Sequence, residues 1–147
     1  MTDISIYQAV FDYLLDSIAV KEVKEDEFFK PFFSIFRELG REQAELKNSS
    51  YGEVNGQIIT KMRFKDFTIR FVFSSSGLVE AVMKVPKEIF FDLKKYAKSN
   101  FSEHRSMTWE KEMFGMMETL KVHRFRTEAN FTRIIGMGYE VMIKHIS

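Results

Sequence analysis

The spacing of the hydrophobic residues changes along the chain, and this change restricts the fold more than any other feature. From Ile4 to Val20 the apolar residues recur at steps of three and four, with Asp12 and Asp16 on the opposite side, which is typical of an amphipathic helix. From Ile58 onward apolar and polar residues alternate, which is typical of half-buried strands. Separate blocks with these two periods predict an α+β fold.

A second helical pattern covers about Glu27 to Leu46, where the apolar residues fall within an arc of about 160°. Pro31 interrupts this pattern, because proline lacks an amide hydrogen and crowds the preceding turn. We therefore expect the regular helix to begin near Lys30, with Pro31 at its first position and residues 26–29 in a separate turn. The polar residues Asn48-Ser49-Ser50 and Gly52 are expected to end this helix.

Three alternating runs predict an antiparallel meander of three strands. The runs are Ile58–Lys65, Phe67–Phe73 and Leu78–Val85, and the turns between them are Lys65–Asp66 and Ser74–Gly77. Tyr51–Val54 is a candidate for a short strand before the meander.

Two further helices are expected after the meander. The first follows Pro86 and ends near Asn100, because its apolar residues share one face and proline suits a first helical position. Residues 101–106 are read as a polar break. The second helix is expected from about Met107 to Lys121, although Gly115 inside it costs about 1 kcal/mol relative to alanine.

The C-terminal part of the chain returns to alternation. Val122–Thr127 is expected to form a short strand, and Asn130–Ile135 with Tyr139–Ile146 a β-hairpin that joins the same sheet. No internal repeat is visible and no flexible linker divides the chain, so residues 1–147 are read as one domain. The predicted order is an N-terminal helix pair, a three-stranded antiparallel meander, two helices and a C-terminal β-hairpin.

The composition excludes several kinds of chemistry. The chain has no cysteine, which excludes disulfides, thiolate catalysis and zinc sites built on sulfur. Its three histidines show no metal-ligand spacing, so neither a metal nor a cofactor is predicted. No apolar run is long enough to cross a membrane and no signal peptide is seen, so a cytoplasmic protein is expected. Because no catalytic constellation is recognisable, the sequence favours a protein that is not an enzyme.

Charge is distributed unevenly along the chain. Residues 1–45 carry ten acidic and five basic residues, a net charge of −5, and the remaining residues carry eleven acidic and seventeen basic residues, a net charge of +6. Such asymmetry is typical of a basic region with an anionic partner. The other interpretation, which the sequence favours, is that the two parts of the chain attract one another within the fold.

The meander is predicted to carry a basic face. If its apolar positions pack on the helices, the opposite side presents the anion-binding candidates Lys61, Arg63, Lys65, Arg70 and Lys84. Clustered lysine and arginine side chains suit phosphates, because each contact releases counterions. The aromatic residues fall on the other side, so base stacking is not favoured. The alternative is an ordinary solvated face.

Three functions remain as hypotheses. The favoured one is protein binding or homodimerisation through an apolar surface, because flexible methionines suit irregular partners. Its candidate residues are Met107, Trp109, Met113, Phe114 and Met117. The second is nucleic-acid binding through the basic face of the sheet. The third is a small-molecule pocket between a curved sheet and the helices.

Overall fold

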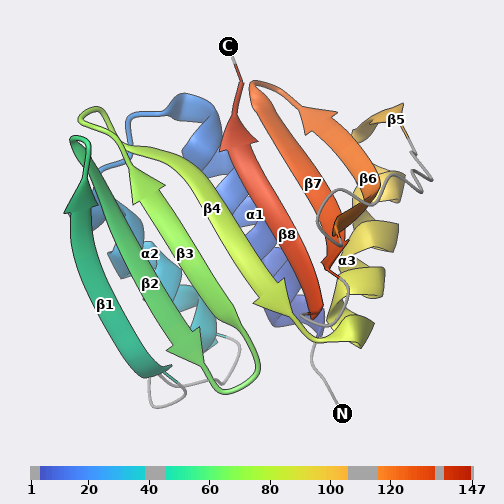
Figure 1. The fold of residues 1–147 in the computed structure, drawn as a ribbon, viewed down its shortest axis with the longest axis horizontal. Coiled ribbons are helices and arrows are strands. Elements are labelled where there is room, and N and C mark those ends of the chain that lie inside the picture. Colours follow the sequence, from blue (N-terminus) through green and yellow to red (C-terminus); the bar gives the residue numbers. More distant parts are fainter. Residues whose placement is uncertain (1–3, 39–45, 106–115, 135–137, 147) are drawn as a thin grey trace.

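The computed structural model describes residues 4–38, 46–105, 116–134 and 138–146. Within these ranges, three helices lie on one side of a single antiparallel sheet (Figure 1), so the fold is mixed α+β, as predicted. The helices are α1 (Ile4–Val20), α2 (Glu25–Glu38) and α3 (Lys87–Asn100). The strands are β1 (Leu46–Val54), β2 (Gln57–Phe64), β3 (Thr68–Phe73), β4 (Leu78–Val85), β5 (Ser102–Arg105), β6 (Met116–Arg124), β7 (Thr127–Ile134) and β8 (Gly138–His145).

The last strand of the chain lies in the middle of the sheet. The strand order is β1-β2-β3-β4-β8-β7-β6-β5, and β4 pairs with β8 in antiparallel orientation, with Val82 opposite Met142. The strands β2, β3 and β4 correspond to the predicted meander, and β7 with β8 to the predicted C-terminal pair. Both groups therefore contribute to one continuous surface.

The backbone contains a repeat that the sequence does not reveal. Each half consists of a helix followed by four strands: α2 with β1 to β4, and α3 with β5 to β8. The strand register recurs as well, because Lys61 lies opposite Arg70 just as Lys121 lies opposite Asn130. The recurrence concerns the order and register of the elements, whereas the expectation of no internal repeat concerned the sequence.

The core lies between the sheet and the helices and is rich in phenylalanine. Phe28 and Phe32 of α2 and Phe71 of β3 have exposed fractions of 0%. The ring centroids of Phe28 and Phe32 lie 5.1 and 5.4 Å from that of Phe71. Under α3, the rings of Phe90 and Phe131 meet at 5.8 Å. Burying each such side chain contributes roughly 1.5–3 kcal/mol, so these rings anchor the helices on the sheet.

Helix α2 begins earlier than predicted and runs through Pro31. Three acidic residues occupy its first turn, where negative charge interacts favourably with the helix dipole. Starting at Glu25 rather than near Lys30 brings Phe28 into the same buried stripe as Phe32, and their rings stack at 5.5 Å. This burial outweighs the cost of proline inside a helix, which is about 3 kcal/mol relative to alanine.

A full strand, β1, occupies positions that the sequence pattern assigned to the end of α2. Leu46 and the run Asn48–Gly52 belong to it, and the candidate strand Tyr51–Val54 is its second half. Residues 39–45 lie outside the described residues. The signal for this hairpin is Asn55-Gly56, whose φ angles of 53° and 78° suit the two-residue turn that this dipeptide favours.

Two further segments are strands where other structures were expected. Ser102–Arg105 forms β5 instead of a polar break, and β6 replaces the last part of the helix predicted from Met107 to Lys121. Leu120 and Val122 have exposed fractions of 0% and 2%, so alternate residues face the core when β6 pairs with β7. The rest of that predicted helix, residues 107–115, lies outside the described residues.

Candidate anion-binding site

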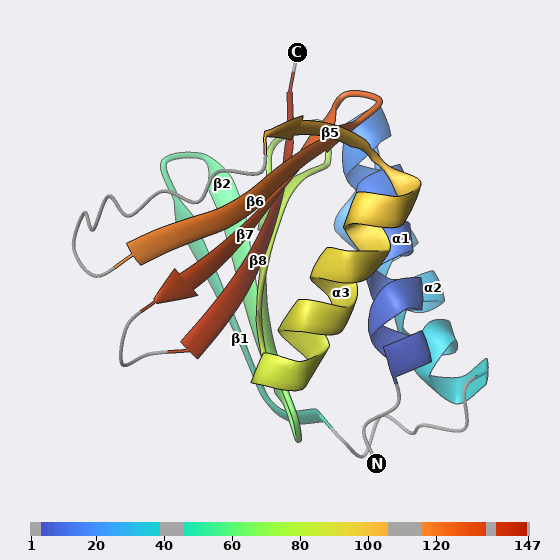
Figure 2. The same ribbon diagram turned by 90° about the vertical axis from the view of Figure 1, so that its right-hand side faces the viewer.

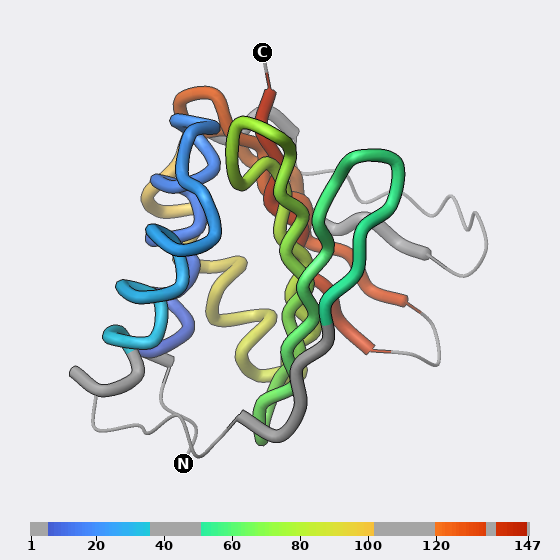
Figure 3. The backbone as a smooth tube through the Cα atoms, turned by 90° about the vertical axis from the view of Figure 1, so that its left-hand side faces the viewer, coloured from blue at the N-terminus to red at the C-terminus, as the bar shows by residue number. Residues whose placement is uncertain are grey.

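One face of the sheet points away from all three described helices. Figures 2 and 3 show the helices gathered on a single side of the strands when the molecule is turned in opposite directions. On the covered side, Met62 and Ile69 have exposed fractions of 8% and 2%. Lys61, Arg63 and Arg70, at the alternate positions, are exposed. The predicted assignment of residues to the two faces of β2 and β3 is therefore confirmed.

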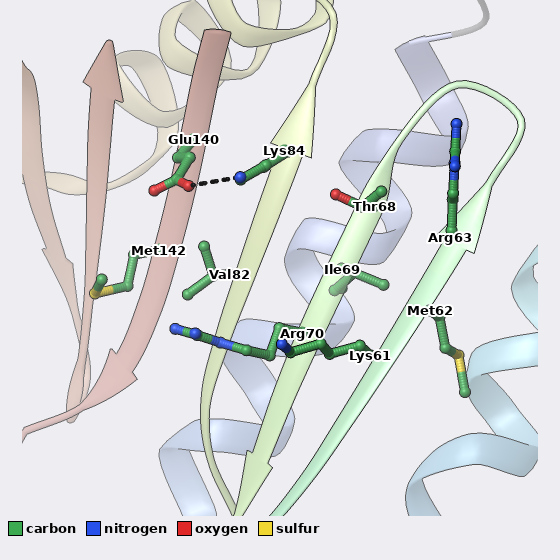
Figure 4. Close-up of a pocket in the computed structure, with 10 residues that line it drawn as sticks. All are labelled: Lys61, Met62, Arg63, Thr68, Ile69, Arg70, Val82, Lys84, Glu140 and Met142. Carbon is green, nitrogen blue, oxygen red and sulfur yellow. Dashed lines mark ion pairs between the residues drawn. The ribbon is translucent and has the colours of Figure 1, made fainter. Parts of the chain in front are cut away.

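An open depression of about 460 Å³ occupies this face. It is lined by residues of β2, β3, β4 and β8 (Figure 4): Lys61, Met62, Arg63, Thr68, Ile69, Arg70, Val82, Lys84, Glu140 and Met142. Val82 lies opposite both Arg70 and Met142 in the strand register, so it forms part of an apolar strip beside the cationic groups. The depression thus combines an apolar base with a positively charged rim.

Three of the lining cations are not neutralised within the described part of the chain. Lys61, Arg63 and Arg70 form no ion pair with any described residue. Lys61 and Arg70 lie directly opposite one another on β2 and β3. Like charges at such positions destabilise a sheet by roughly 0.2–1 kcal/mol. An arrangement that costs stability in the isolated protein is expected where an anionic ligand offsets the repulsion.

Lys84 is the fourth cation of the rim, and it is partly neutralised. Its Nζ atom lies 3.7 Å from Oε1 of Glu140 on β8 (Figure 4), and half of its side chain is exposed. An ion pair this exposed is worth about 0–1 kcal/mol, so the Lys84 ammonium group remains available to an external anion. Glu140 marks the border of the positive region on the β8 side.

The other half of this face is close to electrical balance. Glu128 of β7 lies between Lys121 and Lys144, at 3.0 and 3.7 Å. Burial favours a raised pKa for Glu128, but the hydrogen bond from Lys121 and the charges of both lysines outweigh it, and the pKa is lowered. Glu128 is therefore ionised at neutral pH, and together with Glu80, which lies opposite Lys144 on β4, it balances the two lysines. The positive region is therefore formed by the lining cations of β2, β3 and β4.

The structure places four of the five anion candidates around one depression. Lys61, Arg63, Arg70 and Lys84 line it, whereas Lys65 lies in the exposed turn after β2 and is not among the lining residues. The sequence pattern did not identify Glu140 and Met142 as neighbours of these cations. Local periodicity does not show which strand lies beside β4. Glu140 and Met142 are neighbours of these cations because β4 pairs with β8.

The methionine and aromatic candidates are not gathered into a site by the described structure. Met107, Trp109, Met113 and Phe114 lie outside the described residues. Met117 belongs to β6, so it cannot continue a helical face with the residues before it. The helical spacing that grouped these residues is therefore lost at its C-terminal end.

One contact between the acidic N-terminal region and the basic remainder of the chain joins β6 to α1. Arg124 of β6 contacts Asp16 of α1 at 3.0 Å and lies 3.9 Å from Asp12. This contact realises one of the two expectations, the attraction between the acidic N-terminal region and the basic remainder. It involves none of the four cations at the depression, so it does not explain them.

Comparison with models of protein families, with curated proteins and with solved structures found no significant match. No group of three or more histidine, aspartate or glutamate residues within the described ranges is placed to hold a metal ion. Of the helices seen in the structure, none has both the length and the apolar character needed to cross a membrane. The function is therefore inferred from the residues of the sheet face.

Proposed function

We propose that the open face of the sheet binds the phosphate backbone of a nucleic-acid duplex through Lys61, Arg63 and Arg70, assisted by Lys84. The observation that carries the proposal is the set of three exposed cations that form no ion pair with a described residue, two of them directly opposite in the sheet. Phosphate contacts of this kind release counterions and supply most of sequence-independent binding.

The chemistry of the face favours contacts to the phosphate backbone over stacking on bases. Among the described residues of this face there is no phenylalanine, tyrosine or tryptophan, because the aromatic residues of β2 and β3 point into the core. Proteins that bind single strands need such aromatic platforms. A duplex presents phosphates without requiring unstacked bases, so it suits this surface better.

An internal small-molecule pocket is less consistent with the packing. The space between sheet and helices holds fully buried rings, including Phe11, Phe28, Phe71, Phe90 and Phe131. A ligand there would have to displace closely packed aromatic side chains, which is costly in a core at crystal-like density. The depression lies instead on the open face of the sheet, and its rim is charged.

Protein binding through the methionine-rich segment remains a separate proposal. It is supported by the sequence alone, through Met107, Trp109, Met113 and Phe114. We expect Phe114→Glu to weaken binding of a protein partner or of a second copy while leaving the circular dichroism spectrum unchanged. Unaltered sedimentation and unaltered partner binding would remove this proposal.

The nucleic-acid proposal is tested by fluorescence anisotropy with a short labelled DNA duplex at about 50 mM salt. Arg63→Glu and Arg70→Glu are each expected to weaken binding about tenfold, equivalent to roughly 1.4 kcal/mol. Lys30→Glu is the matched control, because Lys30 is also an exposed cation but lies on α2, away from this face. The proposal fails if the unmodified protein does not bind, or if Lys30→Glu weakens binding as much as the sheet variants.

A further inference from the structure

The depression on the open face has the size of a small-molecule site. Its volume of about 460 Å³ lies within the range of roughly 300–1,000 Å³ that is usual for such sites. Contacts between the rim cations and a duplex backbone leave this space unoccupied, because a duplex, whose major groove alone is about 12 Å wide, is too large to enter it. The depression can therefore hold a ligand that is smaller than a nucleic acid.

Three of the cations are concentrated at one end of the depression. Lys61 lies opposite Arg70, and Arg63 is two residues from Lys61 on β2. Because neighbouring strands lie about 4.8 Å apart and each residue advances a strand by about 3.3 Å, the backbones of these three residues lie within roughly 8 Å of one another. Linked phosphates present several negative charges over so short a distance, and arginine binds phosphate through two parallel hydrogen bonds. This end of the depression therefore suits a polyphosphate.

The other end of the depression is apolar. Val82 on β4 lies opposite Met142 on β8, and both residues line the depression. A methionine side chain is flexible, and its sulfur atom makes favourable contacts with aromatic rings. One flat ring needs no more than a strip of this kind, whereas the successive bases of a single strand need several aromatic platforms. This end therefore suits a single aromatic ring.

Arg70 lies between the cationic end and the apolar end. It is opposite Val82 in the strand register, and Figure 4 shows its side chain extended from β3 across β4, toward Val82 and Met142. A guanidinium group binds phosphate oxygens and also stacks on flat rings. A ligand in which phosphates and a ring are joined can therefore contact Arg70 with both of its parts.

We propose that the depression binds a nucleoside polyphosphate, with the phosphates at Lys61, Arg63 and Arg70 and the base on the strip formed by Val82 and Met142. Such a ligand combines the two chemistries that the two ends of the depression offer. It uses the same cations as the duplex, so the two ligands compete for this face. The inference goes beyond the duplex proposal and does not depend on it, since a nucleotide can bind whether or not a duplex does.

The nucleotide site is tested by isothermal titration calorimetry of the full chain at about 50 mM salt, without divalent cations. The ligands are ATP, GTP, CTP, UTP and inorganic tripolyphosphate, which carries the charge without the nucleoside. At least one of the four nucleotides is expected to bind about tenfold more tightly than tripolyphosphate, because contact with the strip removes apolar surface of the base from water. The inference is overturned if none of the four binds, or if tripolyphosphate binds as tightly as the best of them.

Two variants separate the two ends of the site. Met142→Ala is expected to weaken binding of the best nucleotide about fivefold and to leave tripolyphosphate binding unchanged, because it removes only an apolar contact. Arg70→Gln is expected to weaken binding of both ligands about tenfold, because it removes a phosphate contact. Lys95→Gln, an exposed change on α3, is the control and should alter neither. Unaltered nucleotide binding in Met142→Ala, or an equal loss of both ligands, would overturn the placement of the base.

The nucleotide and duplex proposals fail separately. Nucleotide binding is measured without a duplex, so a protein that binds a nucleotide but no duplex contradicts only the proposed function. A protein that binds the duplex but none of the four nucleotides contradicts only the nucleotide site. If both hold, the best nucleotide at about ten times its Kd is expected to raise the apparent Kd of the duplex about tenfold, because the two ligands share Lys61 and Arg70.

Discussion

Tyr96 and Asp12 connect α3 to α1 through one short hydrogen bond. The Tyr96 hydroxyl donates to Oδ2 of Asp12 at 2.6 Å, and Arg124 approaches the same carboxylate from β6. The hydrogen bond to the Asp12 carboxylate is the main reason that the pKa of Tyr96 is raised to about 12 from 10.0. Because the folded-state pKa is the higher one, this stabilisation is present below pH 10 and is lost as pH rises through about 12.

We predict that Tyr96→Phe lowers the free energy of unfolding by roughly 1.5 kcal/mol at neutral pH, the value expected for a hydrogen bond to a charged group. Urea unfolding of both proteins, repeated from neutral to alkaline pH, measures this difference. The difference in free energy of unfolding between the two proteins should decrease as the pH rises above the ordinary pKa of tyrosine. A gap that stays constant up to the alkaline limit would contradict this role of Tyr96.

Glu128 is expected to make the free energy of unfolding depend on pH in the acid range. Its pKa is lowered from 4.5, because Lys121 and Lys144 outweigh the effect of burial. A lowered folded-state pKa means that its contribution is present above pH 4.5 and is lost as pH falls through the folded-state pKa. Glu128→Gln should therefore unfold with a weaker dependence on pH below 4.5 than the unmodified protein. Identical acid denaturation curves, followed by circular dichroism, would show that Glu128 does not contribute.

At the scale of single elements, hydrophobic periodicity correctly predicted the secondary structure of segments that show a single clear pattern. Helix α1 and the strands β2, β3 and β4 lie where the sequence placed them. The prediction was wrong where two local signals competed. The methionines and Leu120 before Lys121 have helical spacing, but pairing with β7 buries Leu120 and Val122 on one side of a strand. Local spacing contains no information about that partner.

Helix α2 shows a second conflict, between proline and aromatic burial. The sequence indicated a helix start near Lys30, whereas the helix runs through Pro31 and places the rings of Phe28 and Phe32 against one another. Pro31 is exposed, so its ring adds little to the core. We predict that Pro31→Ala stabilises the protein, by about 3 kcal/mol at most. Thermal unfolding measures the effect, and a lower midpoint for the variant would contradict the view that Pro31 strains α2.

At the scale of the whole molecule, the sequence predicted which residues share a face but not which strands are neighbours. The basic side of β2 and β3 follows from period two alone. The depression depends on the pairing of β4 with β8, which places Glu140 beside Lys84 although the two residues are far apart in the sequence. Pairing between distant strands is decided by packing of the complete core, so Glu140 and Met142 could not be identified from local patterns.

The most direct test of the nucleic-acid proposal is the slope of log Kobs against log salt concentration for duplex binding. Three phosphate contacts, from Lys61, Arg63 and Arg70, predict a slope of about −2.7 for each bound chain, or roughly 40-fold weaker binding between about 50 and 200 mM salt. The double variant Arg63→Gln with Arg70→Gln should reduce the slope to about −0.9, while Lys30→Gln with Lys95→Gln leaves it unchanged. The proposal is contradicted if the unmodified protein shows no salt dependence, or if both double variants have the same slope.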